Sequence, residues 1–190
     1  MVPATVEQLL QAETEDSVQE LLADEGSVFL VDWREEDDAI VGYCEDILKT
    51  GDLSAEVVEI EAEPGFEMYI SHGGRRVKVP LVVGIEDRHI TVHTLNELLK
   101  PAFEIRVCVD SNGSDTLAFL PLAAADWSAL EARFGDGVAK HFRKVEERPN
   151  LFTDRWSAAV RPRDNQTLQR TGAAVKRSWL QRLFGRGPGR

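Results

Sequence analysis

The chain has 190 residues, of which 43% are hydrophobic and 29% charged. This is ordinary globular usage for one hydrophobic core, and it excludes a fibrous chain or one disordered throughout. No apolar run approaches the roughly 18 residues that cross a bilayer. The N-terminus reaches acidic residues without the basic and then apolar pattern of a signal peptide. We therefore expect a soluble, cytoplasmic protein without a transmembrane segment.

The charge is distributed unevenly along the chain. Residues 1–154 hold 13 Lys and Arg against 32 Asp and Glu, a net charge of −19, whereas residues 155–190 hold nine against one, a net charge of +8. Such a shift predicts an acidic domain over 1–154 followed by a basic, flexible tail over 155–190. An acidic body repels nucleic acid, so we predict no nucleic-acid partner for it. The oligomeric state is left open.

The first half of the chain predicts two helices and four strands. Apolar residues recur near a 3.6-residue period over 4–24 and again from Asp37 to Lys49, while 27–33 is a short apolar run typical of a buried strand. Alternation predicts strands over 56–61, 66–71 and 75–83 in the middle of the chain. Between the last two, His72-Gly73-Gly74 is typical of a hairpin loop, since glycine adopts positive φ without strain.

The second half begins with a segment in which polar and apolar residues alternate. We interpret 88–94 as a strand, with His89, Thr91 and His93 on one face. Thr94 and Glu97 have the spacing of a capping box and predict a short helix from Leu95.

A hairpin and a final helical segment follow. Strands are predicted over 103–110 and 116–122, with a polar turn between them, and helix from Asp126 to about 147, interrupted at Gly135. Hairpins interleaved with a few helices indicate an α+β fold, with an antiparallel or mixed sheet of about six to seven strands and helices packed on it.

Candidate catalytic and metal-binding residues are few. His89 and His93 are four residues apart and can share a face, which makes them weak candidates for metal ligands, but a third ligand is lacking, so we predict neither metal nor cofactor. Cys44 and Cys108 lack CxxC spacing and are interpreted as buried free thiols. No GxSxG or phosphate-binding glycine motif accompanies them.

Clusters of carboxylates are the more suggestive feature. Glu35, Glu36 and Asp37 follow Trp33 within one cluster. In a second cluster, alternating glutamates would project from one face of a strand; these are Glu59, Glu61 and Glu63. Both clusters are candidate surfaces for a basic protein partner, because complementary charge accelerates association.

The tail contains the string NQTLQRTGAAV, residues 165–175. This region, about 161–190, resembles the repeat-derived or integron-cassette-type tail that is fused to many unrelated bacterial reading frames, which implies a mobile or accessory gene and nothing about the chemistry of the body. The body, through HTLNELLKP and Asp126-Trp127, resembles an uncharacterised bacterial family. Residues 176–184 also have a weak membrane-surface pattern, with apolar and basic sides.

These observations favour a non-enzymatic interaction protein over an enzyme. The leading hypothesis is an immunity or antitoxin-like protein that masks a basic partner through its acidic surface. The alternative is a small hydrolase or metal-dependent enzyme that uses His72, His89 and His93 with nearby carboxylates.

Overall fold

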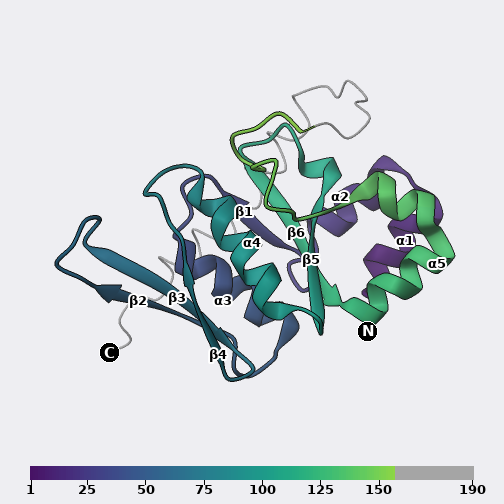
Figure 1. Ribbon diagram of the computed structural model, residues 1–190. Coiled ribbons are helices and arrows are strands. Elements are labelled where there is room, and N and C mark those ends of the chain that lie inside the picture. Colours follow the sequence, from purple (N-terminus) through teal and green to yellow (C-terminus); the bar gives the residue numbers. More distant parts are fainter. Residues whose placement is uncertain (157–190) are drawn as a thin grey trace, which may run out of the picture. The chain divides into compact units, whose positions relative to one another are not determined.

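The computed structural model describes residues 1–156, and the predicted tail beyond Trp156 lies outside the described residues. The described chain contains five α-helices, one short 3₁₀ helix and seven strands in two antiparallel sheets, which confirms the α+β class (Figure 1). In chain order the elements are α1 (Ala4–Ala12), α2 (Glu15–Leu22), β1 (Phe29–Asp32), α3 (Asp37–Leu48), β2 (Ser54–Glu59), β3 (Phe66–His72), β4 (Arg75–Val79), α4 (Asp87–Leu99), β5 (Phe103–Cys108), η1 (Val109–Ser111), β6 (Thr116–Ala123), α5 (Ala124–His141) and β7 (Phe142–Lys144).

The four-stranded sheet has the order β1-β6-β5-β7, with every neighbouring pair antiparallel. Its central strand β6 is buried on both faces, with Leu117 and Phe119 in one apolar cluster and Ala118 and Leu120 in another. This explains why β6 is an almost continuous apolar run rather than an alternating one. The β5–β6 hairpin predicted from the sequence is confirmed.

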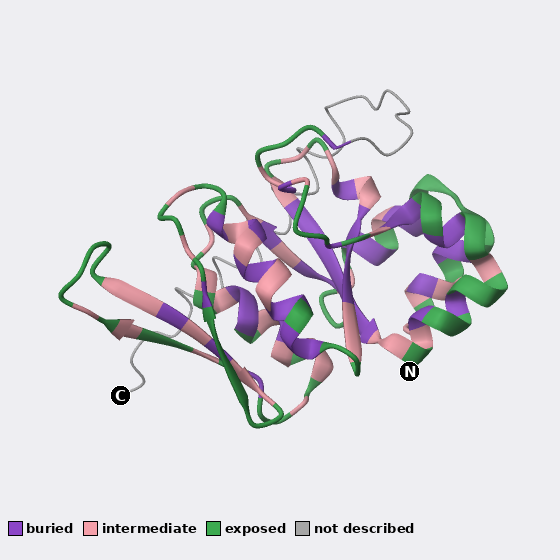
Figure 2. Cartoon of the chain, in the orientation of Figure 1, coloured by how far each residue is buried: buried purple, intermediate pink, exposed green. Residues whose placement is uncertain are grey.

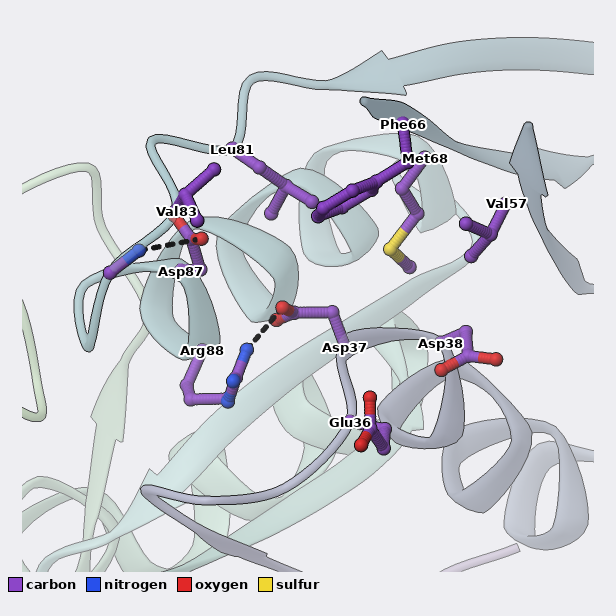
Figure 3. Close-up of a pocket in the computed structure, with 11 residues that line it drawn as sticks. Glu36, Asp37, Asp38, Val57, Phe66, Met68, Leu81, Val83, Asp87 and Arg88 are labelled. Carbon is purple, nitrogen blue, oxygen red and sulfur yellow. Dashed lines mark hydrogen bonds and ion pairs between the residues drawn. The ribbon is translucent and has the colours of Figure 1, made fainter. Parts of the chain in front are cut away.

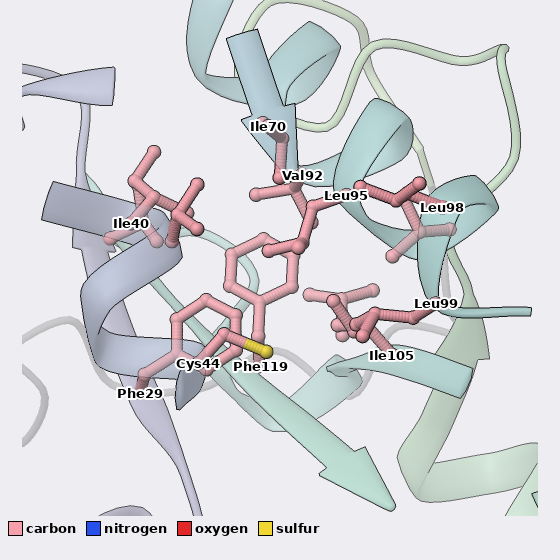
Figure 4. Close-up of a cluster of buried hydrophobic side chains, with 14 of the residues drawn as sticks. Phe29, Ile40, Cys44, Ile70, Val92, Leu95, Leu98, Leu99, Ile105 and Phe119 are labelled. Carbon is pink, nitrogen blue, oxygen red and sulfur yellow. The ribbon is translucent and has the colours of Figure 1, made fainter. Parts of the chain in front are cut away.

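One face of this sheet packs against α3, α4 and the second sheet. Figure 4 shows Ile40 and Cys44 from α3 and Leu95 from α4 meeting Phe119, while Ile70 reaches the same cluster from β3. All five side chains are fully buried. Cys44 is therefore a core thiol, as predicted, and burial raises its pKa.

The opposite face packs against α1, α2 and α5. Its cluster includes Leu9, Leu21 and Trp127, and it also buries Cys108, whose pKa burial raises as well. Arg106 is buried beside Trp127, with its guanidinium 4.2 Å from the ring centroid. This guanidinium pairs with two glutamates, Glu104 and Glu131, each at 2.7 Å. Both faces of β5 are thus covered by protein, as the buried strands in Figure 2 show.

The three-stranded sheet has the order β2-β3-β4. Its β3–β4 hairpin turns at Gly73 and Gly74, whose φ values of 58° and 72° confirm the predicted glycine turn. One face of the sheet packs on α3 and α4 through Met68, Ile70 and Val79, and the β2–β3 loop is exposed (Figure 2).

The single helix predicted over 4–24 is wrong, because the structure has two helices there. The chain leaves helical geometry at Glu13, which has φ 47°, and α2 starts afresh behind Thr14. Thr14 and Ser17 form a reciprocal capping box, with Ser17 N–H donating to Thr14 Oγ1 at 3.2 Å. The shared apolar period hid the break, because both helices bury their stripes in the same cluster.

The predicted strand over 88–94 is also wrong, because this segment opens α4. The helix lies between the two sheets and buries residues on most of its circumference, His89, Thr91, Val92, Leu95, Asn96, Leu98 and Leu99 among them. It consequently lacks the single apolar stripe by which a surface helix is recognised. Thr94 and Glu97, expected to cap its start, lie inside it.

The end of the body also differs from the expectation. The helix α5 begins at Ala124, two residues before Asp126, and leaves helical geometry at Phe134, next to the predicted interruption at Gly135. Residues 142–144 form an edge strand paired with β5 instead of continuing the helix. Trp156 is buried and donates its indole N–H to Leu151 at 2.8 Å, so the packed body extends past residue 154. None of the described helices is both long and apolar enough to cross a membrane.

Candidate functional site

A cleft of about 450 Å³ lies between the start of α3, the inner face of the three-stranded sheet and the loop before α4, and it joins carboxylates to an apolar surface (Figure 3). We call it the acidic cleft. It is lined by Glu36, Asp37, Asp38, Val57, Phe66, Met68, Leu81, Val83, Gly84, Asp87 and Arg88.

One wall of the acidic cleft is apolar. Antiparallel register places Val57 of β2 opposite Met68 of β3, so both side chains project from the same face of the sheet. Met68 is buried, whereas Val57 is 52% exposed. Phe66 and Leu81 continue this wall toward the loop (Figure 3). An exposed valine beside partly buried aromatic and aliphatic groups offers area that a partner can cover.

The facing wall is acidic and is formed by the first turn of α3. Carboxylates are favoured there because the free N–H groups of a helix N-terminus carry partial positive charge. Asp37 is engaged internally: it pairs with Arg88 and accepts a hydrogen bond from Thr91 at 2.8 Å. Glu36 and Asp38 are exposed and make no ion pair or side-chain hydrogen bond within residues 1–156. These two carboxylates are thus available to a cationic ligand.

The third boundary is the loop over 82–85, which is held in an unusual conformation. Val83 has φ 60°, a region that β-branched residues rarely enter and that costs on the order of 1–3 kcal/mol. The buried carboxylate of Asp87 fixes the loop by accepting hydrogen bonds from the N–H groups of Val82 at 2.8 Å and Gly84 at 3.1 Å. The loop displays Val82, Val83 and Ile85 with exposed fractions of 61%, 59% and 45%.

The structure places the predicted acidic residues in three different settings. Of the first cluster, Glu36 and Asp37 line the acidic cleft, whereas Glu35 is outside its lining and accepts a hydrogen bond from Tyr43 at 3.0 Å. Burial, and to a smaller extent the charge of Asp32, raises the pKa of Glu35. Asp38 is an additional cleft residue that belongs to the same acidic run.

The second acidic cluster does not have the predicted arrangement. The strand β2 ends at Glu59, and Glu61 and Glu63 lie in the exposed β2–β3 loop, so the three carboxylates do not project from one strand face. A turn closed by the hydrogen bond from Gly65 N–H to Ala62 O separates them from β3. Glu59 thus ends the strand, and Glu61 and Glu63 lie in the loop that follows it.

Of the three candidate histidines, His89 and His93 lie side by side on α4 and His72 lies on β3, and all three make structural contacts. His89 is buried, its Nε2 lies 3.2 Å from Glu147 O, and its Nδ1 accepts from Leu151 N–H at 3.3 Å, so both ring nitrogens are occupied. Burial lowers the pKa of His89. His93 stacks on His89, with ring centroids 6.2 Å apart. His72 lies in the three-stranded sheet at the β3–β4 turn, and its Nδ1 is 2.8 Å from Asp52 Oδ1.

A second groove, of about 430 Å³, lies between α5 and the β5–β7 edge, and neither groove is lined by a histidine. Among residues 1–156 no group of three or more His, Cys, Asp or Glu side chains is placed to hold a metal ion. The second groove mixes cations with Glu131 and Glu146, so it has no dominant sign of charge.

Comparison with known proteins gave no match to a family model, a curated protein or a solved structure. The site is therefore defined by its geometry alone: an apolar wall, two available carboxylates and a rigidly held aliphatic loop.

Proposed function

We propose that this chain is a non-enzymatic interaction protein that binds a basic protein partner in the acidic cleft. The observation that carries the proposal is the pairing of Glu36 and Asp38, which lack an internal cation, with the exposed apolar surface of Val57 and Val83. A partner that presents an aliphatic side chain next to Lys or Arg satisfies both walls at once. The immunity or antitoxin-like role expected from the sequence is one form of this function.

The strained loop supports the same proposal. Strain in a β-branched residue persists only where the surrounding structure enforces it, and such residues gather at binding and catalytic sites. Here Asp87 enforces it, and the result is a set of aliphatic side chains held outward beside the acidic wall. A preformed apolar surface binds with a smaller entropic cost than one that must order on contact.

The electrostatic part of the proposal is tested with a capped nonapeptide labelled for fluorescence anisotropy. Valine and lysine alternate at its odd positions and serine fills its even positions, so that in an extended chain valine and lysine side chains share one face. The double variant Glu36→Gln/Asp38→Asn is expected to weaken binding about tenfold, since two rim charges at roughly 0.7 kcal/mol each amount to 1.4 kcal/mol. The matched control is Glu15→Gln/Asp16→Asn, which removes two exposed carboxylates from the first turn of α2. Equal weakening by both double variants would show non-specific attraction and contradict the proposal.

The apolar part is tested by Val57→Thr, which keeps the β-branched shape and replaces one methyl group by a hydroxyl. Its control is Val58→Thr on the opposite face of β2. We expect Val57→Thr to weaken binding about fivefold, because covering one methyl contributes on the order of 1 kcal/mol. Equal affinities of the two variants would remove the apolar wall from the binding site.

A further inference from the structure

The strand β2 has an unpaired edge whose hydrogen-bonding groups can be assigned. It pairs with β3 on one side and with no other strand of the described chain. Ile60 N–H donates to Gly65 O at 2.9 Å just beyond the strand end, which places the hydrogen-bonded pairs at every second residue from there. Val58, Glu56 and Ser54 therefore face β3. The N–H and C=O groups of Ala55, Val57 and Glu59 point outward.

This edge lacks most of the features by which proteins usually prevent strand addition, and the charges that it carries are the negative ones of Glu56 and Glu59. Edge strands are commonly protected by lysine, proline, bulges or very short length. The sequence of β2, SAEVVE, has six residues and none of these protections. By contrast, the opposite edge strand β4 carries Arg75, Arg76 and Lys78 and is followed by Pro80. The edge strands of the other sheet, β1 and β7, have four and three residues.

The free edge and the acidic cleft meet at one residue. Val57 points its backbone N–H outward along the edge, and its side chain lines the cleft (Figure 3). A strand added to β2 would place every second side chain on the cleft face, beside Val57 and within the reach of Glu36 and Asp38. One extended segment would thus use the edge, the apolar wall and the available carboxylates together.

We propose that the basic partner binds as an extended segment that adds to the edge of β2, with aliphatic side chains directed into the acidic cleft and Lys or Arg side chains beside its carboxylates. The inference rests on the proposed function and specifies the backbone geometry of the same site. A second copy of this chain is a poorer occupant. Pairing of β2 with β2 would bring Glu56 and Glu59 of both copies together in a body whose charge is already strongly negative.

Hydrogen exchange followed by NMR on the full chain tests the edge directly. In the free protein the amides of Ala55, Val57 and Glu59 are expected to exchange rapidly. Saturating valine–lysine nonapeptide should slow them by about tenfold or more, while Glu56 and Val58, already paired with β3, change little. Unchanged exchange at the three outward amides in the presence of bound peptide would overturn strand addition.

Backbone methylation of the peptide separates strand addition from the proposed function. N-methyl groups on one valine and one lysine block one edge of the peptide strand, and N-methyl groups on two serines block the other. Strand addition predicts that one pattern weakens binding about thirtyfold, through two lost hydrogen bonds, while the other pattern has little effect.

Each negative result of these peptide experiments has its own interpretation. Equal effects of the two patterns, with binding still sensitive to Glu36→Gln/Asp38→Asn, would overturn the strand geometry and leave the cleft as the binding site. A peptide that does not bind at all would overturn both proposals. Concentration-dependent protection of Ala55, Val57 and Glu59 without peptide would show self-association through β2 and overturn the assignment of a basic partner.

Discussion

Asp87→Asn tests most directly what holds the loop over 82–85 at the acidic cleft. Asp87 is 4% exposed, and its carboxylate accepts hydrogen bonds from two backbone N–H groups, those of Val82 and Gly84. An asparagine side chain has one acceptor oxygen, so one N–H loses its partner and faces an amide NH₂ group. Since a hydrogen bond to a charged acceptor contributes about 1.5–3 kcal/mol and the remaining bond loses its charge, we expect a loss of about 2–4 kcal/mol in the free energy of unfolding.

Urea denaturation followed by tryptophan fluorescence measures this loss. The matched control is Asp46→Asn, an exposed carboxylate on α3, which should change the free energy of unfolding by less than about 0.5 kcal/mol. We also expect faster amide exchange over residues 82–85 in Asp87→Asn, because the carboxylate holds the loop. A stability of Asp87→Asn equal to that of the control would refute the argument that this carboxylate enforces the strained conformation of Val83.

Three further predictions concern the rest of the body. Arg106→Met leaves two glutamates without their buried cation and should lower the free energy of unfolding, measured in urea, by about 3 kcal/mol. Arg133→Met breaks an exposed ion pair and should lower it by less than about 1 kcal/mol. Equal losses would contradict the buried ion-pair network. Burial lowers the pKa of His89, so the stability contributed by the neutral imidazole is present above its ordinary pKa of 6.5 and is lost as pH falls through the pKa of the folded state. An NMR titration that gives His89 a pKa of 6.5 or higher would contradict this prediction. Cys44 and Cys108 should resist thiol reagents until urea unfolds the protein, and rapid reaction of either thiol in the native state would refute its burial.

The hairpins could be predicted from the sequence because their signals are local. Gly73 and Gly74 supply the positive φ values of a two-residue turn, and the polar turn between β5 and β6 separates two apolar strands. The position of Cys44 followed from the apolar stripe of α3, which covers one side of that helix. In each case a few neighbouring residues contain the whole signal.

The segment that opens α4 could not be predicted because its environment comes from distant parts of the chain. His89 and Thr91 alternate with Ile90 and Val92, as in a strand with one polar face. In the structure the polar groups are satisfied by tertiary partners: His89 contacts Glu147 O, and Thr91 donates to Asp37. Burial of these polar side chains removes the amphipathic pattern on which the sequence argument depends.

The acidic cleft was predictable only on one of its walls. The acidic run containing Glu36 and Asp37 is visible in the sequence, and its placement at a helix start agrees with the helix dipole. The apolar wall depends on the register that brings Val57 beside Met68, and the aliphatic loop depends on the positive φ of Val83. Neither the register nor the loop conformation has a local sequence signal.

The measurement that tests the central claim most directly is the ratio of peptide dissociation constants for two double variants of equal charge. The valine–lysine nonapeptide is titrated at fixed, moderate salt against Glu36→Gln/Asp38→Asn and against Glu15→Gln/Asp16→Asn. The acidic cleft as a binding site predicts a ratio of about ten, because only the first pair lines the cleft. A ratio of one, with both variants equally weakened or both unchanged, would contradict it.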